Sequence, residues 1–307
     1  MIFSTLGHIQ NNVYNLGLTE CPIFLLDTPT PVIFDAGISC AVKLYAEGIR
    51  LILGERQPAV LFLTHVHWDH CGAVSYLKNS FPQMKVAASY LAVDILKRPN
   101  ALALISRLNE NMLDGIRSTP GLDPSFLNDE PFSSFEIDIK LQDRRVINLG
   151  EGTVIEVLAT PGHTQDHMSF YLPSQETLIA GEAAGVYYGP ETVSTEFVSN
   201  YDAYLSSLQR LSTLPIEVFC QGHYQHLLGR DEISAFFKRS IYETMHFKTR
   251  VLDLLEQENG LIERVIQRVK AERYDMIKGP KQPEGPYLLN LKAQVAHLAA
   301  TRNNSQV

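Results

Sequence analysis

The chain has 307 residues, which is enough for one large domain or for a domain with an extension. Its net charge is −8 and no basic run breaks this balance, which argues against broad electrostatic binding to nucleic acid. No stretch reaches the ~18 consecutive apolar residues of a membrane helix, and the N-terminus does not resemble a signal peptide. Four scattered cysteines are typical of a reduced protein. We therefore expect a cytoplasmic protein that binds neither nucleic acid nor membrane.

The first third of the chain alternates short apolar runs with turn residues. Strands are predicted at residues 13–18, 22–27, 31–35, 59–63 and 85–88, and helices at 41–53 and 71–81. We expect the first three strands to pair antiparallel, because only a few turn residues separate them. The strand at 59–63 is apolar throughout, which predicts that it is buried on both faces.

The middle of the chain continues the pattern. Strands are predicted at residues 146–149, 153–158, 168–172, 177–180 and 216–220, and a helix at 201–211. We expect the strand at 216–220 to be the last strand of the core. A helical insert is predicted at about 98–135, with an amphipathic helix at 102–116 and a loop at 119–124.

The end of the chain is predicted to be helical. Asp231 is predicted to be a helix N-cap, and further helices are predicted at 261–274 and 287–301, separated by the Gly- and Pro-rich segment 279–286. We interpret residues 1–230 as one domain and residues 231–307 as a helical extension that packs on it. The extension is either a packing or homodimer surface or a wall of a substrate pocket, and the sequence leaves both open.

The segment His65-Val66-His67-Trp68-Asp69-His70 places four metal-ligand side chains within six residues, directly after the strand at 59–63. Ligands that leave the end of a rigid strand are held in position before a metal arrives. Imidazoles with a carboxylate suit zinc, iron or manganese better than calcium or magnesium, which prefer oxygen ligands. The segment therefore predicts a transition-metal site.

Three later strands also end in ligand-type side chains. His163 follows the strand at 153–158, Glu182 follows the strand at 177–180, and His223 follows the strand at 216–220. Chance explains any one of these, but four apolar runs with the same ending predict that the side chains converge on one site.

The motifs Thr64-His-Val-His-Trp-Asp-His-Cys-Gly72, Pro161-Gly-His-Thr164, Gly181-Glu182 and Gly222-His223 resemble, in this order, the metallo-β-lactamase superfamily. The resemblance implies an α/β fold, the four-layer αββα sandwich, here with a C-terminal helical extension. It implies two divalent cations, zinc first, with iron or manganese as alternatives. It also implies the ligands: His65, His67 and His163 for the first metal, and Asp69, His70 and His223 for the second.

Glu182 departs from the family pattern, which usually has aspartate as the carboxylate that bridges the two metals. Glutamate is longer by one methylene group and can still bridge, but it shifts the metal spacing. The substitution leaves open a centre with one metal or an inactive centre. Cys71 and Cys220 lie near the motifs, and we interpret both as small buried residues.

The resemblance implies a metal-dependent hydrolase that acts on a small ester-like substrate, with thioester first and lactone second. Asp69 is expected to accept a proton from the attacking water as well as to bind metal. Tyr187 and Tyr188 are further catalytic candidates, because lactonase-like relatives use a tyrosine in this region. His167 is expected to orient a ligand, and His226 is either an outer-shell residue or a surface residue.

Other functions remain open from the sequence. The same ligands serve phosphodiesterases and, with a single iron, persulfide dioxygenases. A regulatory or binding protein with a vestigial metal site is the alternative from a different class, motivated by Glu182 and the long helical tail. The sequence has no Gly-x-Ser-x-Gly motif, so we expect no serine nucleophile on such an elbow.

Overall fold

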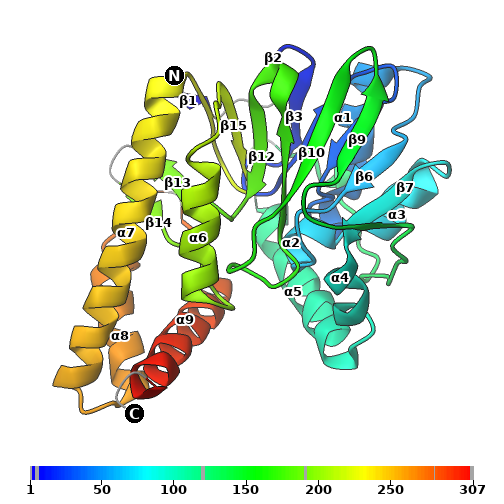
Figure 1. Cartoon of the computed structure of the whole chain (residues 1–307). Helices are drawn as coiled ribbons and strands as arrows, with labels where there is room; N and C mark the ends of the chain where they lie inside the picture. The colour runs from blue at the N-terminus through cyan, green and yellow to red at the C-terminus, as the bar shows by residue number, and fades with distance from the viewer. Residues whose placement is uncertain (1, 4–6, 119–121, 190–191, 280, 305–307) are drawn as a thin grey trace. The chain divides into compact units, whose positions relative to one another are not determined.

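The computed structural model describes residues 2–3, 7–118, 122–189, 192–279 and 281–304 (Figure 1). Contacts divide the chain into two units. The first comprises residues 1–159, 166–181 and 216–229, and the second comprises 160–165, 182–215 and 230–307. The domain limit at residue 230 stays a prediction. The predicted loop at 119–124 and the predicted break at 279–286 lie partly outside the described residues, at 119–121 and 280.

One sheet of the first unit is formed by strands that neighbour each other in chain order. They are β2 (Gly7–Gln10), β3 (Val13–Gly17), β4 (Pro22–Leu26), β5 (Val32–Phe34), β6 (Val60–Phe62), β7 (Lys85–Ser89) and β8 (Ile139–Leu141). The pairs β3–β4 and β4–β5 are antiparallel, as predicted, and β2 adds a further antiparallel pair with β3 that was not predicted. The pairs from β5 to β8 are parallel. Strand β6 therefore lies between two parallel neighbours, which explains its apolar sequence.

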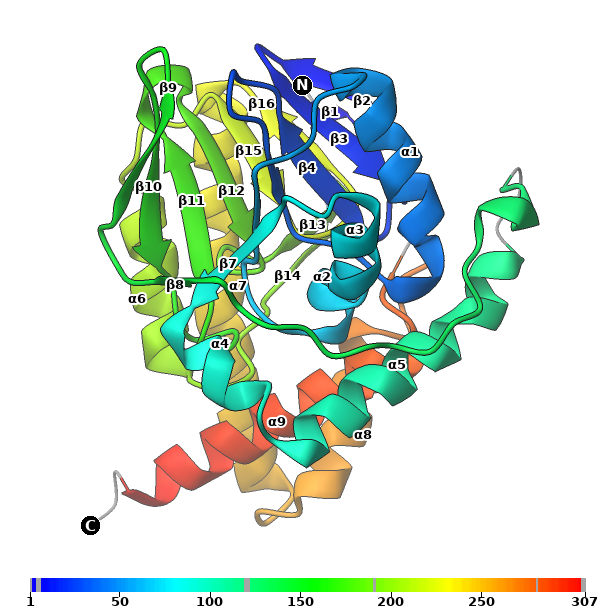
Figure 2. The same ribbon diagram turned by 90° about the vertical axis from the view of Figure 1, so that its right-hand side faces the viewer.

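Helices cover one face of this sheet (Figure 2). They are α1 (Val42–Leu53), α2 (Trp68–Cys71), α3 (Val74–Ser80), α4 (Tyr90–Ile95) and α5 (Pro99–Arg117), with short 3₁₀ turns at Ser39–Ala41 and Pro124–Phe126. Tyr45, Ile49 and Leu77 are fully buried against the sheet. The prediction of one helix at 71–81 is wrong in detail. Helix α2 begins inside the histidine motif, and Ala73 leaves helical angles before α3 begins.

The second sheet of the first unit has the order β1-β16-β15-β12-β11-β10-β9. Its strands are β1 (Ile2–Phe3), β9 (Val146–Gly150), β10 (Thr153–Ala159), β11 (Met168–Leu172), β12 (Thr177–Gly181), β15 (Val218–Gln221) and β16 (His226–Leu228). Because β11 is antiparallel to both β10 and β12, and β15 is parallel to β12, the carboxyl ends of β10, β12 and β15 lie at one edge. The prediction that 216–220 forms the last core strand is wrong, since β16 follows it and pairs with β1.

The two sheets share an apolar core within the first unit. Phe34 and Phe62 come from one sheet and Phe170 from the other, and their ring centroids lie 5.2–5.6 Å apart. All three rings are almost completely buried, and burial of large rings stabilises a sandwich strongly. The mixed α/β sandwich that the sequence predicts is therefore the observed fold.

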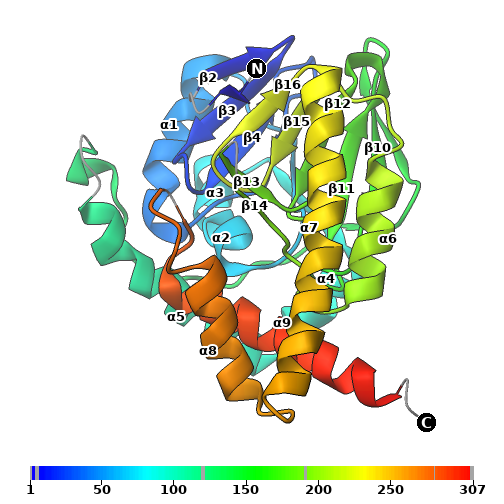
Figure 3. The ribbon, with the colours of Figure 1, turned by 90° about the vertical axis from the view of Figure 1, so that its left-hand side faces the viewer.

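The second unit is mostly helical (Figure 3). It contains α6 (Tyr201–Leu211), α7 (Arg230–Gln257), α8 (Ile262–Arg273), α9 (Glu284–Asn304) and the hairpin strands β13 (Val186–Gly189) and β14 (Thr192–Ser194). Helix α7 contacts α6, α8, α9 and β14, and residues such as Phe236, Phe247 and Val251 give it a buried face. The predicted C-terminal helices are confirmed, but two of their limits are wrong. Helix α7 begins at Arg230, before the predicted N-cap Asp231, and α9 begins at Glu284, inside the predicted break at 279–286. Among the described residues, no helix has the length and apolar character needed to cross a membrane.

Candidate metal centre

The histidine motif lies at the carboxyl end of β6, inside the first unit. His65, Asp69 and His70 are buried, and His67 is partly buried. The ring centroids of His65 and His67 lie 4.4 Å apart, and those of His65 and His70 also lie 4.4 Å apart. The extended backbone of His67 followed by the turn of α2 produces this cluster, because it folds His70 back towards His65.

Asp35 organises two of these histidines, His65 and His70. The residue directly follows β5 and is buried. Its carboxylate accepts hydrogen bonds from the Thr64 backbone N–H at 2.8 Å, the Thr64 hydroxyl at 2.9 Å and His70 Nδ1 at 2.9 Å. The Thr64 hydroxyl has one proton and donates it to Asp35, so it accepts from His65 Nδ1, 3.0 Å away. One buried carboxylate therefore orients both rings.

The sequence places Asp35 only at the end of the predicted strand at 31–35, and this role of Asp35 is not apparent from it. The residue type and position of Asp35 were a usable signal. Asp35 directly follows β5, and β5 pairs with β6, so its carboxylate lies beside the histidine motif that follows β6. The φ angle of Asp35 is 60°, a left-handed conformation that aspartate tolerates better than most residues.

The hydrogen bonds determine which ring nitrogen can bind a metal. A carboxylate or a carbonyl oxygen only accepts hydrogen bonds, so the ring nitrogen that contacts it donates. His70 Nδ1 donates to Asp35, and His223 Nδ1 donates to the Glu20 carbonyl oxygen, 2.6 Å away. In the neutral rings of His65, His70 and His223 the lone pair is therefore on Nε2. This is the arrangement that metal-binding histidines adopt, and the donor set fits a divalent transition metal.

His223 and Asp69 come together in the first unit. His223 follows β15, and its Nε2 lies 3.6 Å from Asp69 Oδ2. Two ligand atoms bound at ~2.0 Å to a tetrahedral metal lie about 3.3 Å apart, so this separation suits a shared cation. The Tyr224 backbone N–H donates to the Thr19 carbonyl oxygen at 2.8 Å and fixes the loop that carries His223.

His167 lies beside the cluster, and its expected role of orienting a ligand stays a prediction. Its ring stacks on that of His65, with centroids 5.1 Å apart and planes inclined by 28°. Gly181, with a φ angle of 52°, lies so close that a Cβ atom there would be 2.6 Å from His167 Nε2. The interpretation of His226 as a surface residue is wrong: it is buried in β16, and burial lowers its pKa to about 4.

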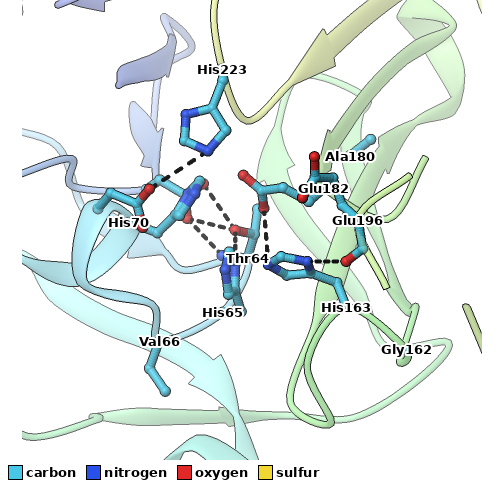
Figure 4. Close-up of polar contacts among 12 residues, drawn as sticks. Thr64, His65, Val66, His70, Gly162, His163, Ala180, Glu182, Glu196 and His223 are labelled. Carbon is cyan, nitrogen blue, oxygen red and sulfur yellow. Dashed lines mark hydrogen bonds and ion pairs between the residues drawn. The ribbon is translucent and has the colours of Figure 1, made fainter. Parts of the chain in front are cut away.

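Two further predicted ligands, His163 and Glu182, lie in the second unit. His163 Nε2 lies 3.9 Å from Glu182 Oε2, and both side chains are buried (Figure 4). His163 Nδ1 donates to the Glu196 carbonyl oxygen, which again leaves the lone pair of the neutral ring on Nε2. Gly162 has a φ angle of 130°, and a Cβ atom there would lie 2.2 Å from the Tyr204 backbone. Glycine therefore lets the loop before His163 pack against α6.

The two tyrosine candidates differ in their surroundings within the second unit. Tyr187 packs its ring edge-on against Phe236, with centroids 6.3 Å apart, and burial raises its pKa. Tyr188 lines a cavity of about 920 Å³ together with aromatic and charged side chains of α7, α8 and α9. The aromatic residues include Tyr242, Phe247 and Tyr287, and the cations include Arg239, Arg250 and Arg273.

Cys71 and Cys220 are both fully buried, as predicted. Burial raises the pKa of both thiols, so they remain neutral small side chains of the core.

Comparison with known proteins places this chain in a family. Residues 17–223 match the Metallo-beta-lactamase superfamily, and the chain belongs to it. It is 26% identical over 165 residues to an atrochrysone carboxyl ACP thioesterase of Aspergillus fumigatus, covering 54% of this chain and 38% of that protein. It is also 26% identical over 218 residues to a probable metallo-hydrolase of Bacillus subtilis, covering 68% of this chain and 82% of that protein.

A solved structure shares the fold. A metallo-beta-lactamase family protein from Thermus thermophilus superposes with a TM-score of 0.65 at 20% identity. The likeness covers 96% of this chain and 94% of that one. It therefore includes the C-terminal helices as well as the sheets.

Proposed function

We propose that the protein is a metal-dependent hydrolase of small ester-like substrates, with thioesters first and lactones second. The observation that carries this proposal is the orientation of four histidines. His65, His70, His163 and His223 each direct Nδ1 to a hydrogen-bond acceptor, so that Nε2 holds the lone pair that a metal needs. Histidines that only pack in a core are not expected to share this orientation at four positions.

The full proposed ligand set follows the order of the sequence motifs. It consists of His65, His67, Asp69, His70, His163, Glu182 and His223. Membership of the superfamily and the order of the motifs support this grouping. So does the topology, since His163, Glu182 and His223 follow β10, β12 and β15, whose carboxyl ends share one edge of their sheet. Glu182 would help to hold the metals in place of the aspartate that the family usually has, and its extra methylene group makes the number of bound metals the first quantity to measure.

The chain's own residues have defined tasks in this reaction. Bound divalent cations supply a water of lowered pKa and polarise the substrate carbonyl. Asp69 accepts a proton from the attacking water and passes it to the leaving group. Asp35 and Thr64 hold the rings of His65 and His70 in position, which limits reorganisation during the reaction. The Tyr188 hydroxyl donates a hydrogen bond to the substrate carbonyl oxygen.

The substrate class is proposed on three grounds. One relative is named as an acyl carrier protein thioesterase, although the chain matches only 38% of that protein's length. The cavity beside Tyr188 has a volume of about 920 Å³ and is lined by aromatic side chains and by arginines that form ion pairs with Glu243 and Glu272. It is large enough for an acyl group with a polar end. A thiolate is also a better leaving group than an alkoxide, so a thioester needs less help from a general acid.

Metal analysis and a substrate screen test the proposal. We expect about two metals per chain and turnover of acyl-thioesters or acyl-lactones. The His67→Ala variant should lose turnover, whereas His8→Ala, which changes an exposed histidine bonded to the Asn11 carbonyl oxygen, should keep it. Faster turnover of bis-p-nitrophenyl phosphate would instead identify a phosphodiesterase, and oxygen uptake with a persulfide would identify a dioxygenase. Protein that is metal-free and inert on every substrate would contradict the proposal and favour a regulatory role.

A further inference from the structure

A cysteine that the motifs do not include lies at the proposed centre. Cys21 directly precedes β4 and is only 5% exposed. Its Sγ, an oxygen of the Asp69 carboxylate and a ring nitrogen of His223 all lie within 4.8 Å of one another. All three residues belong to the first unit. No other cysteine of the described chain falls in such a group.

The segment that carries Cys21 is held rigidly. The Tyr45 hydroxyl donates to the Cys21 carbonyl oxygen at 2.8 Å, and Tyr45 is itself fully buried. The two preceding carbonyl oxygens accept from the Tyr224 backbone N–H and from His223 Nδ1. The same short segment therefore positions the thiol and fixes the ring of His223. Because both groups depend on one set of contacts, their relative position is settled before a cation binds.

We propose that Cys21 binds, as a thiolate, the cation that Asp69 and His223 hold. This inference rests on the metal centre proposed above and adds one ligand to it. On binding, the S–H bond breaks as the sulfur–metal bond forms, and the proton leaves to solvent. A ligand group of thiolate, imidazole and carboxylate is well suited to zinc, whereas manganese and magnesium favour oxygen ligands.

The other cysteines provide a matched control. Cys40 is also free and buried, 2% exposed, in the short 3₁₀ turn before α1. Substitution of either Cys21 or Cys40 by serine changes one buried sulfur to oxygen at nearly constant volume. Only the Cys21 substitution should change the ligands of the bound metal.

Cobalt substitution tests the inference by absorption spectroscopy, independently of activity. Cobalt-loaded wild-type protein and Cys40→Ser should show a near-ultraviolet sulfur-to-cobalt charge-transfer band together with visible d–d bands. Cys21→Ser should keep d–d bands and lose the charge-transfer band. Cys21→Ala, which cannot substitute a hydroxyl for the thiol, should lose it as well. Competition between zinc and manganese, followed by elemental analysis, should show a lower zinc preference in Cys21→Ser than in wild type.

The outcomes separate this inference from the proposed function. Visible d–d bands without a charge-transfer band in wild-type protein would overturn the role of Cys21 and leave the metal centre intact. Persistence of the charge-transfer band in Cys21→Ser would also overturn it. If cobalt produced no bands in wild-type protein at all, the metal centre and the cysteine ligand would both be wrong.

Discussion

His70 Nδ1 lies 2.9 Å from Asp35 Oδ2, and the two side chains are only 3% and 5% exposed. The contact joins helix α2, which carries a proposed metal ligand, to the end of β5. Strand β5 pairs with β6, the strand that precedes the histidine motif. Since Thr64 links the same carboxylate to His65, a change at Asp35 affects two ligands at once.

Replacing Asp35 by asparagine should weaken metal binding more than it weakens the fold. The amide can no longer accept all three protons, so at least one of His65 and His70 loses its orientation. Loss of such an outer-shell partner typically lowers metal affinity about 10- to 100-fold. Competition with a chromophoric chelator measures this change, and thermal unfolding of the metal-free protein measures the effect on stability.

Asp27→Asn is the matched control for this prediction. Asp27 also directly follows a strand of the same sheet, but its carboxylate pairs with Arg56 at 2.8 Å and is 24% exposed. Partly exposed ion pairs contribute little to the stability of the fold. Asp27→Asn should therefore leave the fold intact and bind metal as wild type does. Equal metal affinities for Asp35→Asn and Asp27→Asn would show that Asp35 does not orient the metal ligands.

Two glycines with left-handed backbones should respond differently to alanine. At Gly152, with a φ angle of 77°, a Cβ atom would meet nothing within 4 Å, so Gly152→Ala should cost only about 1–2 kcal/mol. At Gly181 the Cβ atom would overlap His167 Nε2 and approach Thr64, so Gly181→Ala should cost about 2–5 kcal/mol. Chemical denaturation compares the two variants, and equal losses would show that packing at His167 adds nothing.

The elements with clear patterns could be predicted from the sequence. The apolar run at 153–158 became β10, and the helical spacing after Asp231 became α7. Strand β16 could not be predicted in the same way. It has three residues, begins with a histidine, and owes its burial to pairing with β15 and with β1 from the other end of the chain. Local sequence carries no signal of such a distant partner.

The candidate site also contains residues that the sequence reveals and residues that it does not. Histidines at strand ends are conspicuous because their residue type and spacing carry the chemistry. Asp35 and Cys21 are inconspicuous, since an aspartate before Ala-Gly reads as a turn and a cysteine before proline as a buried residue. The site role of Cys21 depends on the hydrogen bond between His223 and Glu20, 203 positions apart in the sequence. Only the folded structure reveals that the two loops meet.

His226 should make the protein sensitive to mild acid. Burial lowers its pKa from 6.5 to about 4, so the folded state resists the proton that the unfolded state accepts. Its contribution to stability is fully present above pH 6.5 and is lost as the pH falls from 6.5 towards 4. The loss should reach about 1–3 kcal/mol, because one pKa unit corresponds to ~1.4 kcal/mol.

The variant His226→Gln isolates this contribution, since glutamine retains hydrogen-bonding groups and does not titrate. Urea unfolding of the metal-free protein at several pH values between 7 and 4.5 should give a flatter stability profile for the variant. Carboxylates titrate in both proteins and cancel in the comparison. Parallel profiles for the two proteins would mean that His226 is protonated as easily in the folded state as in the unfolded chain.

Substitution of Tyr187 and Tyr188 by phenylalanine should show which of the two hydroxyl groups takes part in catalysis. Tyr188 lines the cavity of the second unit, whereas Tyr187 packs against Phe236. If Tyr188 donates to the substrate oxygen as charge develops there, Tyr188→Phe should lower kcat by about 100-fold, the usual effect of losing one such donor. Tyr187→Phe keeps its ring contacts and should stay close to wild type. Steady-state kinetics of both metal-loaded variants on one thioester decide between them: a loss confined to Tyr187→Phe would exchange their roles, and no loss in either would leave the substrate carbonyl to the metals alone.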